Sequence, residues 1–306
     1  MEIDRPVDSD SASHAPDSSA HLDRSTQSAE ATTLSGPEQR AEVHRHYRER
    51  VDHAYDTARG GSADSFPDLR AAWDKHVEKY PEGERPISRT LPDGSWTDGA
   101  DRALSPEQNA DASRACVDIR KEGKEVILPA IHRIEAANPN RHLAGLEHML
   151  KGEDRLKEKV SDVLRYHPDW SAREAINDVP DAVRYTFAYS EVNYTNGVRE
   201  DVDRLKADGF ELVKLKNLWS KEHYKGINSQ WRMPETGLRF EVQFHTPTSH
   251  EAKELTHKAY ERLRDPATSR DEEVLLEDYQ RGVNVHVPLP RDVFEIEDYP
   301  PEKPDD

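Results

Sequence analysis

Residues 224–246 read YKGINSQWRMPETGLRFEVQFHT, and the alternation within this stretch decides the fold. In LRFEVQFHT every second side chain is apolar, which is typical of a strand that buries one face. YKGINSQWRM alternates in the same way, and the intervening Pro-Glu-Thr-Gly has the composition of a hairpin turn. The stretch therefore predicts a β-hairpin with one apolar face against helices and one polar face.

The polar face of this hairpin has two interpretations. A solvated face is common in antiparallel sheets. A carboxylate flanked by amide, imidazole and guanidinium groups, with a phenol and a glycine on the partner strand, also fits a nucleotide-phosphate site. The residues concerned are Arg239, Glu241, Gln243 and His245 on one strand and Tyr224, Gly226, Asn228, Gln230 and Arg232 on the other.

Helices and strands alternate on both sides of the hairpin. β-branched and aromatic residues predict strands over 179–189 and 210–219. Apolar periodicity predicts helices over 105–137, 142–165, 196–208 and 250–264, and a short helix after Ser171. Together these elements predict an α+β fold, in which a mixed sheet of about four to five strands is flanked by helices and preceded by a helical N-terminal region.

Composition divides the chain into five parts. They are a disordered acidic leader (1–38), a helical N-terminal region (39–124), the α+β domain (125–268), a C-terminal helix and extension (269–292) and an acidic tail (293–306). Within the N-terminal part, periodicity predicts short helices over 37–60 and 66–77. The stretch 80–102, which is rich in Pro, Gly, Asp and Ser, predicts a loop.

Charge and cysteine content exclude several classes of protein. The net charge of -18 is concentrated at the ends, because 1–40 and 293–306 each carry net -5, whereas 141–265 holds 21 Lys+Arg against 22 Asp+Glu. No run of about 18 apolar residues occurs and the first residues are acidic, which excludes a membrane span and an ordinary signal peptide. The single cysteine, Cys116, excludes a disulfide framework and a four-cysteine zinc site, and we interpret it as a packing residue.

Two groups of cations lie in the charge-balanced stretch. Lys151, Arg155 and Lys159 repeat every four residues, so on a helix they form either a solvated face or a row that could bind a triphosphate. A second basic group surrounds Trp219 and could hold another phosphate-bearing partner; it comprises Lys214, Lys216, Lys221 and Lys225. Asp178 and Asp181 are the acids that could join Glu241 as oxygen ligands of Mg²⁺.

The motifs LEHMLKGEDRLKEK, DAVRYT, KNLW, YKGIN and FEVQFHTPTSHEAKE occur in this order. They resemble the synthetase domain of RelA/SpoT-type (p)ppGpp synthetases, most closely its single-domain, toxin-like branch, and YKGIN and FEVQFHT are the most specific of them. The resemblance implies a nucleotidyltransferase-like fold over 125–268. It also implies transfer of pyrophosphate from ATP to the 3′ hydroxyl of a purine nucleotide (GDP/GTP or ADP/ATP), with Mg²⁺ as cofactor and AMP as leaving group.

The resemblance also implies roles for individual residues. Asp181 and Glu241 would be the catalytic acids and bind Mg²⁺, and Glu241 could instead take the proton of the attacking hydroxyl. ATP binding is implied for Lys151, Arg155, Lys159 and Arg184. Acceptor binding is implied for Tyr224, Asn228, Lys214, Lys216, Lys221, Gln243 and His245. Met149 and Arg155 depart from the family pattern, which more often has Arg and Ser, and the short spacing from Asp181 to Arg184 keeps Asp178 as a rival metal ligand.

The leading hypothesis is therefore a Mg²⁺-dependent pyrophosphokinase that acts as a growth-inhibiting toxin or effector. The alternatives are pyrophosphorylation of the tRNA 3′ end and a catalytically silent module that binds nucleotide or RNA. No HD dipeptide occurs, so we expect no hydrolase half. The expected partners are ATP and a purine nucleotide, with tRNA and an immunity or antitoxin protein as further candidates and no membrane. The expected location is the cytoplasm, with delivery into a target cell by a specialised secretion system as the alternative.

Overall fold

The computed structural model describes residues 67–81 and 87–301. The leader predicted over 1–38 and the helix predicted over 37–60 lie outside the described residues. The helix predicted over 66–77 is confirmed as α2 (Pro67–Lys79). None of the helices in the described ranges is both long and apolar enough to cross a bilayer.

The loop predicted over 80–102 is wrong in its described part. Three short strands, β1 (Arg89–Thr90), β2 (Trp96–Thr97) and β3 (Ala103–Leu104), form an antiparallel sheet. Strands of two residues leave no periodic pattern, so alternation could not reveal them. Instead, one side chain anchors them, because Trp96 is buried and its Nε1 donates to Asp154 Oδ1 at 3.0 Å.

The long helix predicted over 105–137 is confirmed, with one irregularity. It consists of α3 (Pro106–Glu122), a π-helical turn (Gly123–Ile127) and α4 (Leu128–Ala136). Ser105 caps its start by accepting a hydrogen bond from the backbone nitrogen of Gln108. At the π turn the carbonyl of Gly123 accepts a hydrogen bond from Tyr185 Oη at 2.6 Å, so this turn fastens the helix to the sheet.

The single helix predicted over 142–165 is wrong in its first half. The chain forms β4 (Arg141–Ala144), a 3₁₀ turn (Leu146–His148) and only then α5 (Glu153–Tyr166). Gly145 adopts φ +64°, which ends the strand with a conformation that other residues rarely take. The apolar residues before Gly152 fit a helical period by coincidence, and sheet pairing with the strand over 184–189 determines their structure.

The main sheet has five strands in the order β4-β5-β8-β7-β6. Its remaining strands are β5 (Arg184–Tyr189), β6 (Glu211–Asn217), β7 (Ile227–Arg232) and β8 (Arg239–His245). The β5–β8 pair is parallel and the other pairs are antiparallel, so the sheet is mixed. The helices around it are α6 (Ala172–Asn177), α7 (Tyr194–Ala207), α8 (Pro247–Leu263) and α9 (Arg270–Asn284). The predicted α+β class, sheet size and β7–β8 hairpin are confirmed.

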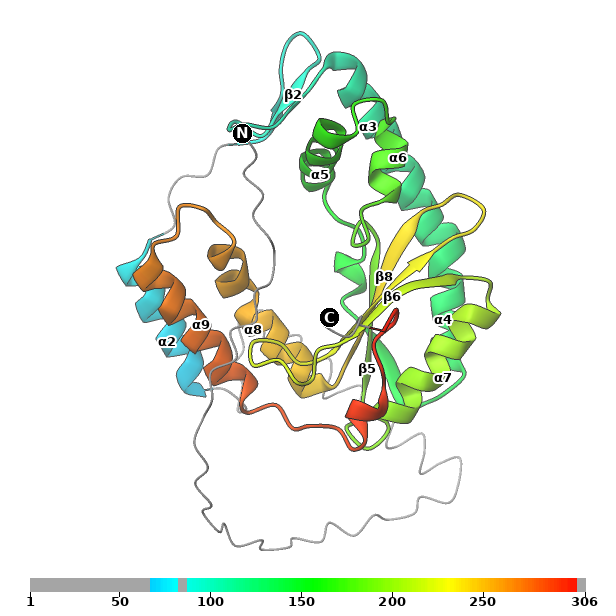
Figure 1. Cartoon of the computed structure of the whole chain (residues 1–306), viewed down its shortest axis with the longest axis vertical. Coiled ribbons are helices and arrows are strands. Elements are labelled where there is room, and N and C mark those ends of the chain that lie inside the picture. Colours follow the sequence, from blue (N-terminus) through cyan, green and yellow to red (C-terminus); the bar gives the residue numbers. More distant parts are fainter. Residues whose placement is uncertain (1–66, 82–86, 302–306) are drawn as a thin grey trace, which may run out of the picture. The chain divides into compact units, whose positions relative to one another are not determined.

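The two faces of the sheet are both covered by helices. In Figure 1, α3, α4 and α7 lie on one side of the sheet and α8 lies on the other. The apolar face of the hairpin is buried as predicted, including Trp231, Phe240 and Phe244. The polar face is also largely withdrawn from water, since Glu241 is 8% exposed and His245 0%. The solvated-face interpretation is therefore wrong for β8.

A buried ion pair joins the first strand of the sheet to α7. Arg141 Nη1 lies 2.8 Å from Asp201 Oδ1, and both side chains are 0% exposed. Tyr189 Oη donates to the same carboxylate at 2.6 Å, and Arg204 Nη1 donates to it at 3.0 Å. Burial raises the pKa of Asp201 to about 6, although Arg141 and the other partners oppose the rise. The buried Asp201 carboxylate thus depends on its partners to keep its negative charge.

We expect Arg141→Met to lower the free energy of unfolding by about 3–5 kcal/mol, because it leaves the Asp201 carboxylate buried without its main counter-charge. The matched control is Arg133→Met, which removes a longer and more exposed pair with Asp208, at 3.4 Å. The control should cost less than about 1 kcal/mol. Urea unfolding of both variants measures this, and equal midpoints would contradict a structural role for the buried pair.

Candidate functional site

The centre of the candidate site is an arginine that joins two carboxylates. Arg184 begins β5 and stands opposite Glu241 in the parallel register with β8. Its Nε donates to Glu241 Oε2 at 2.5 Å, and its Nη2 donates to Asp181 Oδ2 at 3.2 Å. Lys151 Nζ donates to the same Asp181 oxygen at 2.5 Å. Two acids that lie 60 positions apart in the sequence are thereby brought to one guanidinium.

Backbone pairing places Lys151 beside this cluster. The backbone nitrogen of Lys151 donates to the carbonyl of Ala182 at 3.1 Å, and that of Arg184 donates to the carbonyl of Met149 at 2.8 Å. Lys151 therefore lies on a short extended segment before α5, and the helical row predicted for Lys151, Arg155 and Lys159 is wrong at its first member. Pairing with the chain next to β5, rather than helical periodicity, brings the lysine to Asp181.

The charges of the cluster stabilise each other. Burial alone would raise the pKa of Asp181, but the hydrogen bond and charge of Lys151, with the charges of Arg184 and Lys159, hold it below its usual value. Burial would lower the pKa of Arg184, and the two carboxylates more than offset this effect. Asp181 is thus an anion and Arg184 a cation at neutral pH. Such an arrangement can exchange its internal partners for phosphate oxygens and metal without changing protonation.

The opposite end of the polar face holds a tyrosine–histidine pair. Tyr224 Oη donates to Asn228 Oδ1 at 2.8 Å and lies 2.9 Å from His245 Nε2. His245 Nδ1 lies 2.9 Å from Ser249 Oγ on α8. Burial, with the charges of His250 and Lys253, holds the pKa of His245 well below its usual value, so the imidazole is neutral. The Tyr224 ring is thereby held in one orientation.

The glycine of YKGIN is explained by this pair. A Cβ atom at Gly226 would lie 2.8 Å from His245 Cε1, which is closer than side chains approach. A larger residue here would displace the imidazole and, through it, the hydroxyl of Tyr224. In the YKGIN motif, Tyr224 therefore contacts His245, and Gly226 leaves the room that the His245 imidazole needs.

The other predicted cations are only partly brought to the site. Arg155 turns away, because its Nη1 donates to Glu158 at 3.0 Å and its Nη2 lies 3.9 Å from Glu261. Lys214 and Lys216 stand opposite Gln230 and Asn228 in the β6–β7 register and thus share the polar face. Lys221 is exposed. Lys225 Nζ donates to the carbonyls of Trp219 and Lys221, so it closes the loop before β7.

The acidic C-terminal segment is packed against β6 in its described part. Tyr299 and Leu215 exchange two backbone hydrogen bonds, at 2.7 and 2.9 Å. Asp298 accepts from Lys216 Nζ at 2.7 Å and from the backbone nitrogen of Asn217 at 2.7 Å. The Lys216 ammonium, which was predicted to bind the acceptor, is therefore paired within the chain.

Sequence reasoning missed a buried lysine on α8. Lys253 is mostly withdrawn from water, and its Nζ lies 3.3 Å from Glu254 Oε1. Burial lowers its pKa, while the neighbouring charges of Glu254, Arg184 and Glu241 also act on it. Because α8 packs on the polar face, a polar stripe on that helix would have been the signal to seek. The apolar period of 250–264 predicts the helix but does not single out this lysine.

The two candidate metal acids differ in their surroundings. Asp178 pairs with Arg239 at 2.7 Å and is 55% exposed. Asp181 shares Arg184 with Glu241. Gln243 Oε1 is buried beside them and has no hydrogen-bond partner among the described residues, and Gln243 Nε2 donates to Glu241 Oε2 at 3.2 Å. Two carboxylates and a spare amide oxygen are hard donors of the kind that Mg²⁺ prefers, so this set fits the ion in chemistry. In the described ranges, no group of three or more His, Cys, Asp or Glu side chains is arranged to hold a metal.

Comparison with known proteins gives structural similarities only. No family model matches the chain, and no curated protein matches it. A protein of Streptococcus mutans UA159, smu.1046c, is similar with a TM-score of 0.38 at 13% identity, over 55% of this chain and 86% of that chain. The small alarmone synthetase 1 of Bacillus subtilis, solved with its product pppGpp, is similar with a TM-score of 0.37 at 12% identity, over 56% of this chain and 91% of that chain.

A third similar structure is a GTP pyrophosphokinase family protein of Streptococcus pneumoniae, with a TM-score of 0.37 at 12% identity, over 58% of this chain and 87% of that chain. At this identity most positions differ, so the functional argument rests on the site's own residues.

We expect Gly226→Ala to lower the free energy of unfolding by about 1–3 kcal/mol, because the added methyl group overpacks against the buried imidazole of His245. Gly282→Ala on α9 is the control, since among the described residues its Cβ would meet only Leu69 Cδ2 of α2, at an ordinary 3.9 Å. The control should be neutral or stabilising by up to about 1 kcal/mol. Chemical denaturation measures both, and an unchanged Gly226→Ala midpoint would mean that His245 is not confined as described.

Proposed function

We propose that the chain is a Mg²⁺-dependent ATP:nucleotide 3′-pyrophosphotransferase that acts on a purine nucleotide (GDP/GTP or ADP/ATP). The observation that carries the proposal is that Asp181 and Glu241 both pair with Arg184, and that Lys151 pairs with the Asp181 carboxylate. Transfer of a pyrophosphoryl group needs acids to hold a divalent metal and cations to hold phosphates, and both kinds of group meet here. The motif resemblance supplies the choice of reaction.

In the proposed reaction, the 3′ oxygen of the acceptor attacks the β phosphorus of ATP. A new oxygen–phosphorus bond forms, the bond between the β phosphorus and the oxygen bridging to the α phosphate breaks, and AMP leaves. Lys151, Lys159 and Arg184 bind the phosphate oxygens, on which charge is distributed in the transition state. The Glu241 carboxylate accepts the proton of the attacking hydroxyl. Magnesium, when bound, would neutralise further phosphate charge, and Asp181 would hold it, with Gln243 Oε1 as an additional ligand; Glu241 would join them if it binds the metal instead of taking the proton.

The acceptor is proposed to bind at the tyrosine end of the polar face. The Tyr224 ring, fixed by Asn228 and His245, offers a platform for stacking of a nucleobase. Gln243 provides polar atoms between this ring and Glu241. Lys214, Lys216 and Lys221 are the proposed contacts for the acceptor's phosphates, and Lys216 would exchange its ion pair with Asp298 for them. A growth-inhibiting role, as an effector with an immunity partner, is part of the proposal and follows from the resemblance.

Incubation with γ-labelled ATP and Mg²⁺ tests the reaction directly. GDP, GTP, ADP and total tRNA are offered as acceptors in separate reactions, and the products are separated by chromatography. We expect the label on the 3′ pyrophosphate of the purine nucleotide acceptor, and unlabelled AMP in an amount equal to that product. Label on tRNA would replace the nucleotide acceptor with an RNA. Release of ADP and free phosphate would identify an ATPase, and nucleotide binding without turnover would identify a silent module.

The acids are tested by isosteric amides. We expect Glu241→Gln and Asp181→Asn each to lower the turnover rate by about 10²–10⁴-fold, because each removes a charge on which metal binding or proton transfer depends. Asp178→Asn is the matched control, since Asp178 pairs with Arg239 instead of Arg184. It should retain most of the activity. If Asp178→Asn is the more damaging of the two aspartate variants, the metal acid has been assigned to the wrong residue.

The tyrosine is tested by its effect on the two substrates separately. We expect Tyr224→Ala to raise the KM of the acceptor by about one to two decades, since base stacking on an aromatic side chain contributes about 1–3 kcal/mol. The KM of ATP should stay nearly unchanged, and Tyr224→Phe, which keeps the ring, should behave closer to the parent. A rise confined to the KM of ATP would place Tyr224 at the donor and reverse the two sites.

A further inference from the structure

The C-terminal segment of the described chain runs from the start of α7 to the edge of β6 (Figure 1). Its first half is anchored in the core, because Val293 and Ile296 are buried. The carbonyls of these two residues also accept hydrogen bonds from Asn217 Nδ2 on β6, at 2.8 and 2.9 Å. The segment is therefore fixed to the sheet as far as Ile296.

The second half of the segment, 297–301, is held differently. None of these five residues is buried, and Asp298 is half-buried while the others are exposed. Its contacts with β6 are the backbone pairing of Tyr299 with Leu215 and the hydrogen bonds of the Asp298 carboxylate. Release of 297–301 from β6 would thus expose no core side chain, and Ile296 would serve as the pivot.

The Asp298 carboxylate is bound by two donors, as an oxygen pair of a phosphate would be. Oδ2 accepts from Lys216 Nζ and Oδ1 accepts from the backbone nitrogen of Asn217, each at 2.7 Å. An ammonium and a backbone N–H are also donors that bind phosphate oxygens in proteins. The Lys216 and Asp298 side chains are 26% and 25% exposed, so solvent reaches the pair. An external anion can therefore take the same two donors when Asp298 leaves them.

The position of Lys216 connects this anion site with the tyrosine end of the polar face. Lys216 stands opposite Asn228 in the β6–β7 register, and Asn228 accepts the hydrogen bond of Tyr224 Oη. Paired strands lie about 5 Å apart, so an anion held by Lys216 would lie beside the residue that orients Tyr224. Asp298 thus places a negative charge where the phosphates of a nucleotide at Tyr224 would be expected.

We propose that Asp298 is an internal competitor for the anion site on Lys216 and Asn217. Its carboxylate holds the two donors until a polyphosphate displaces it and 297–301 turns away about Ile296. A carboxylate carries one negative charge and a polyphosphate carries several, so Asp298 makes the site selective for polyphosphates over singly charged anions. On the proposed function, on which only this last assignment rests, the displacing polyphosphate belongs to the acceptor, and Asp298 sets the acceptor's affinity.

Labelling of lysines in the full chain tests the exchange without turnover. The protein is treated briefly with an amine-acetylating reagent while inorganic pyrophosphate is titrated at constant ionic strength, and acetylation of Lys216 is followed by mass spectrometry. Lys206 on α7, which is exposed, serves as the internal reference. We expect pyrophosphate to protect Lys216 at roughly millimolar concentration or below, and acetate at the same ionic strength to leave its acetylation unchanged.

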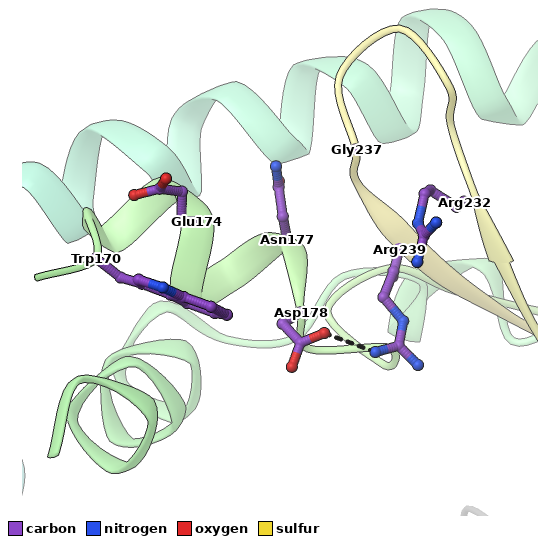
Figure 2. Close-up of a pocket in the computed structure, with 7 residues that line it drawn as sticks. All are labelled: Trp170, Glu174, Asn177, Asp178, Arg232, Gly237 and Arg239. Atoms are coloured by element: carbon purple, nitrogen blue, oxygen red, sulfur yellow. Dashed lines mark hydrogen bonds and ion pairs between the residues drawn. The ribbon is translucent and has the colours of Figure 1, made fainter. Parts of the chain in front are cut away.

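Paired variants connect the protection to Asp298. Asp298→Asn keeps the shape of the side chain and removes its charge, so the pyrophosphate concentration that halves Lys216 acetylation should fall by about 3–10-fold. Asp178→Asn is the matched control, because it removes the charge of another 2.7 Å ion pair, with Arg239, near the start of β8 (Figure 2). Glu295→Gln removes a charge from the same segment, where Glu295 pairs with Arg199. Both controls should stay within about twofold of the parent, and urea midpoints verify folding.

Failure of the internal competition and failure of the enzyme proposal give different results. Absence of protection at Lys216, equal protection by acetate, or equal values for Asp298→Asn and the two controls overturns the competition, and label transfer from ATP in that case leaves the enzyme proposal standing. If labelling responds as expected and no transfer occurs with any acceptor, the competition stands and the enzyme proposal fails. If transfer occurs, Asp298→Asn should lower the KM of the acceptor by the same factor and leave the KM of ATP unchanged, and an unchanged acceptor KM overturns the link to the acceptor.

Discussion

A guanidinium that is largely withdrawn from water needs anionic partners, and Arg184 meets this constraint by pairing with two carboxylates, those of Asp181 and Glu241. Its position at the start of β5 is set by the parallel pairing with β8, which places Glu241 directly opposite. The loop before β5 supplies Asp181, and the segment before α5 supplies Lys151. If the β5–β8 register shifted by one residue, Glu241 would turn to the apolar face and the cluster would lose its centre. The site therefore assembles only when β5 and β8 pair in this register.

The polar face of the sheet is buried in the protein interior although it carries charged side chains. α8 covers it, and the contacts of His245 with Tyr224 and Ser249 tie that helix, the strand and the YKGIN loop together. Electrostatic interactions are stronger in such a setting than on a solvated face, because water screens them less. The same burial raises the cost of any unpaired charge, which explains why Lys253 lies next to Glu254 and near Glu241.

The hairpin and its two faces could be predicted from alternation, because a period of two is visible in the nine residues 238–246, which include β8. The helix that carries Arg155 and Lys159 and the strands that carry Arg184, Lys214 and Lys216 are also predicted from their periods. Three features could not be predicted in this way. β4 is not visible in the sequence because its few residues also fit a helical period. Lys151 pairs with Asp181 because two segments that are distant in the sequence lie side by side in the fold. The polar face is buried because α8, which follows it in the sequence, packs on it. In each case tertiary contacts, which local pattern does not contain, decided the outcome.

The backbone pairing of Leu215 with Tyr299 has a consequence for how copies of this chain meet. β6 ends the order of the main sheet, so its outer side would otherwise offer free backbone donors and acceptors to another molecule. The C-terminal segment occupies part of that side, and the two residues that follow, Pro300 and Pro301, have no backbone N–H with which to extend a strand. At the β6 edge the chain thus blocks the growth of its own sheet into an intermolecular one, and a segment rich in acids also adds like-charge repulsion between copies there.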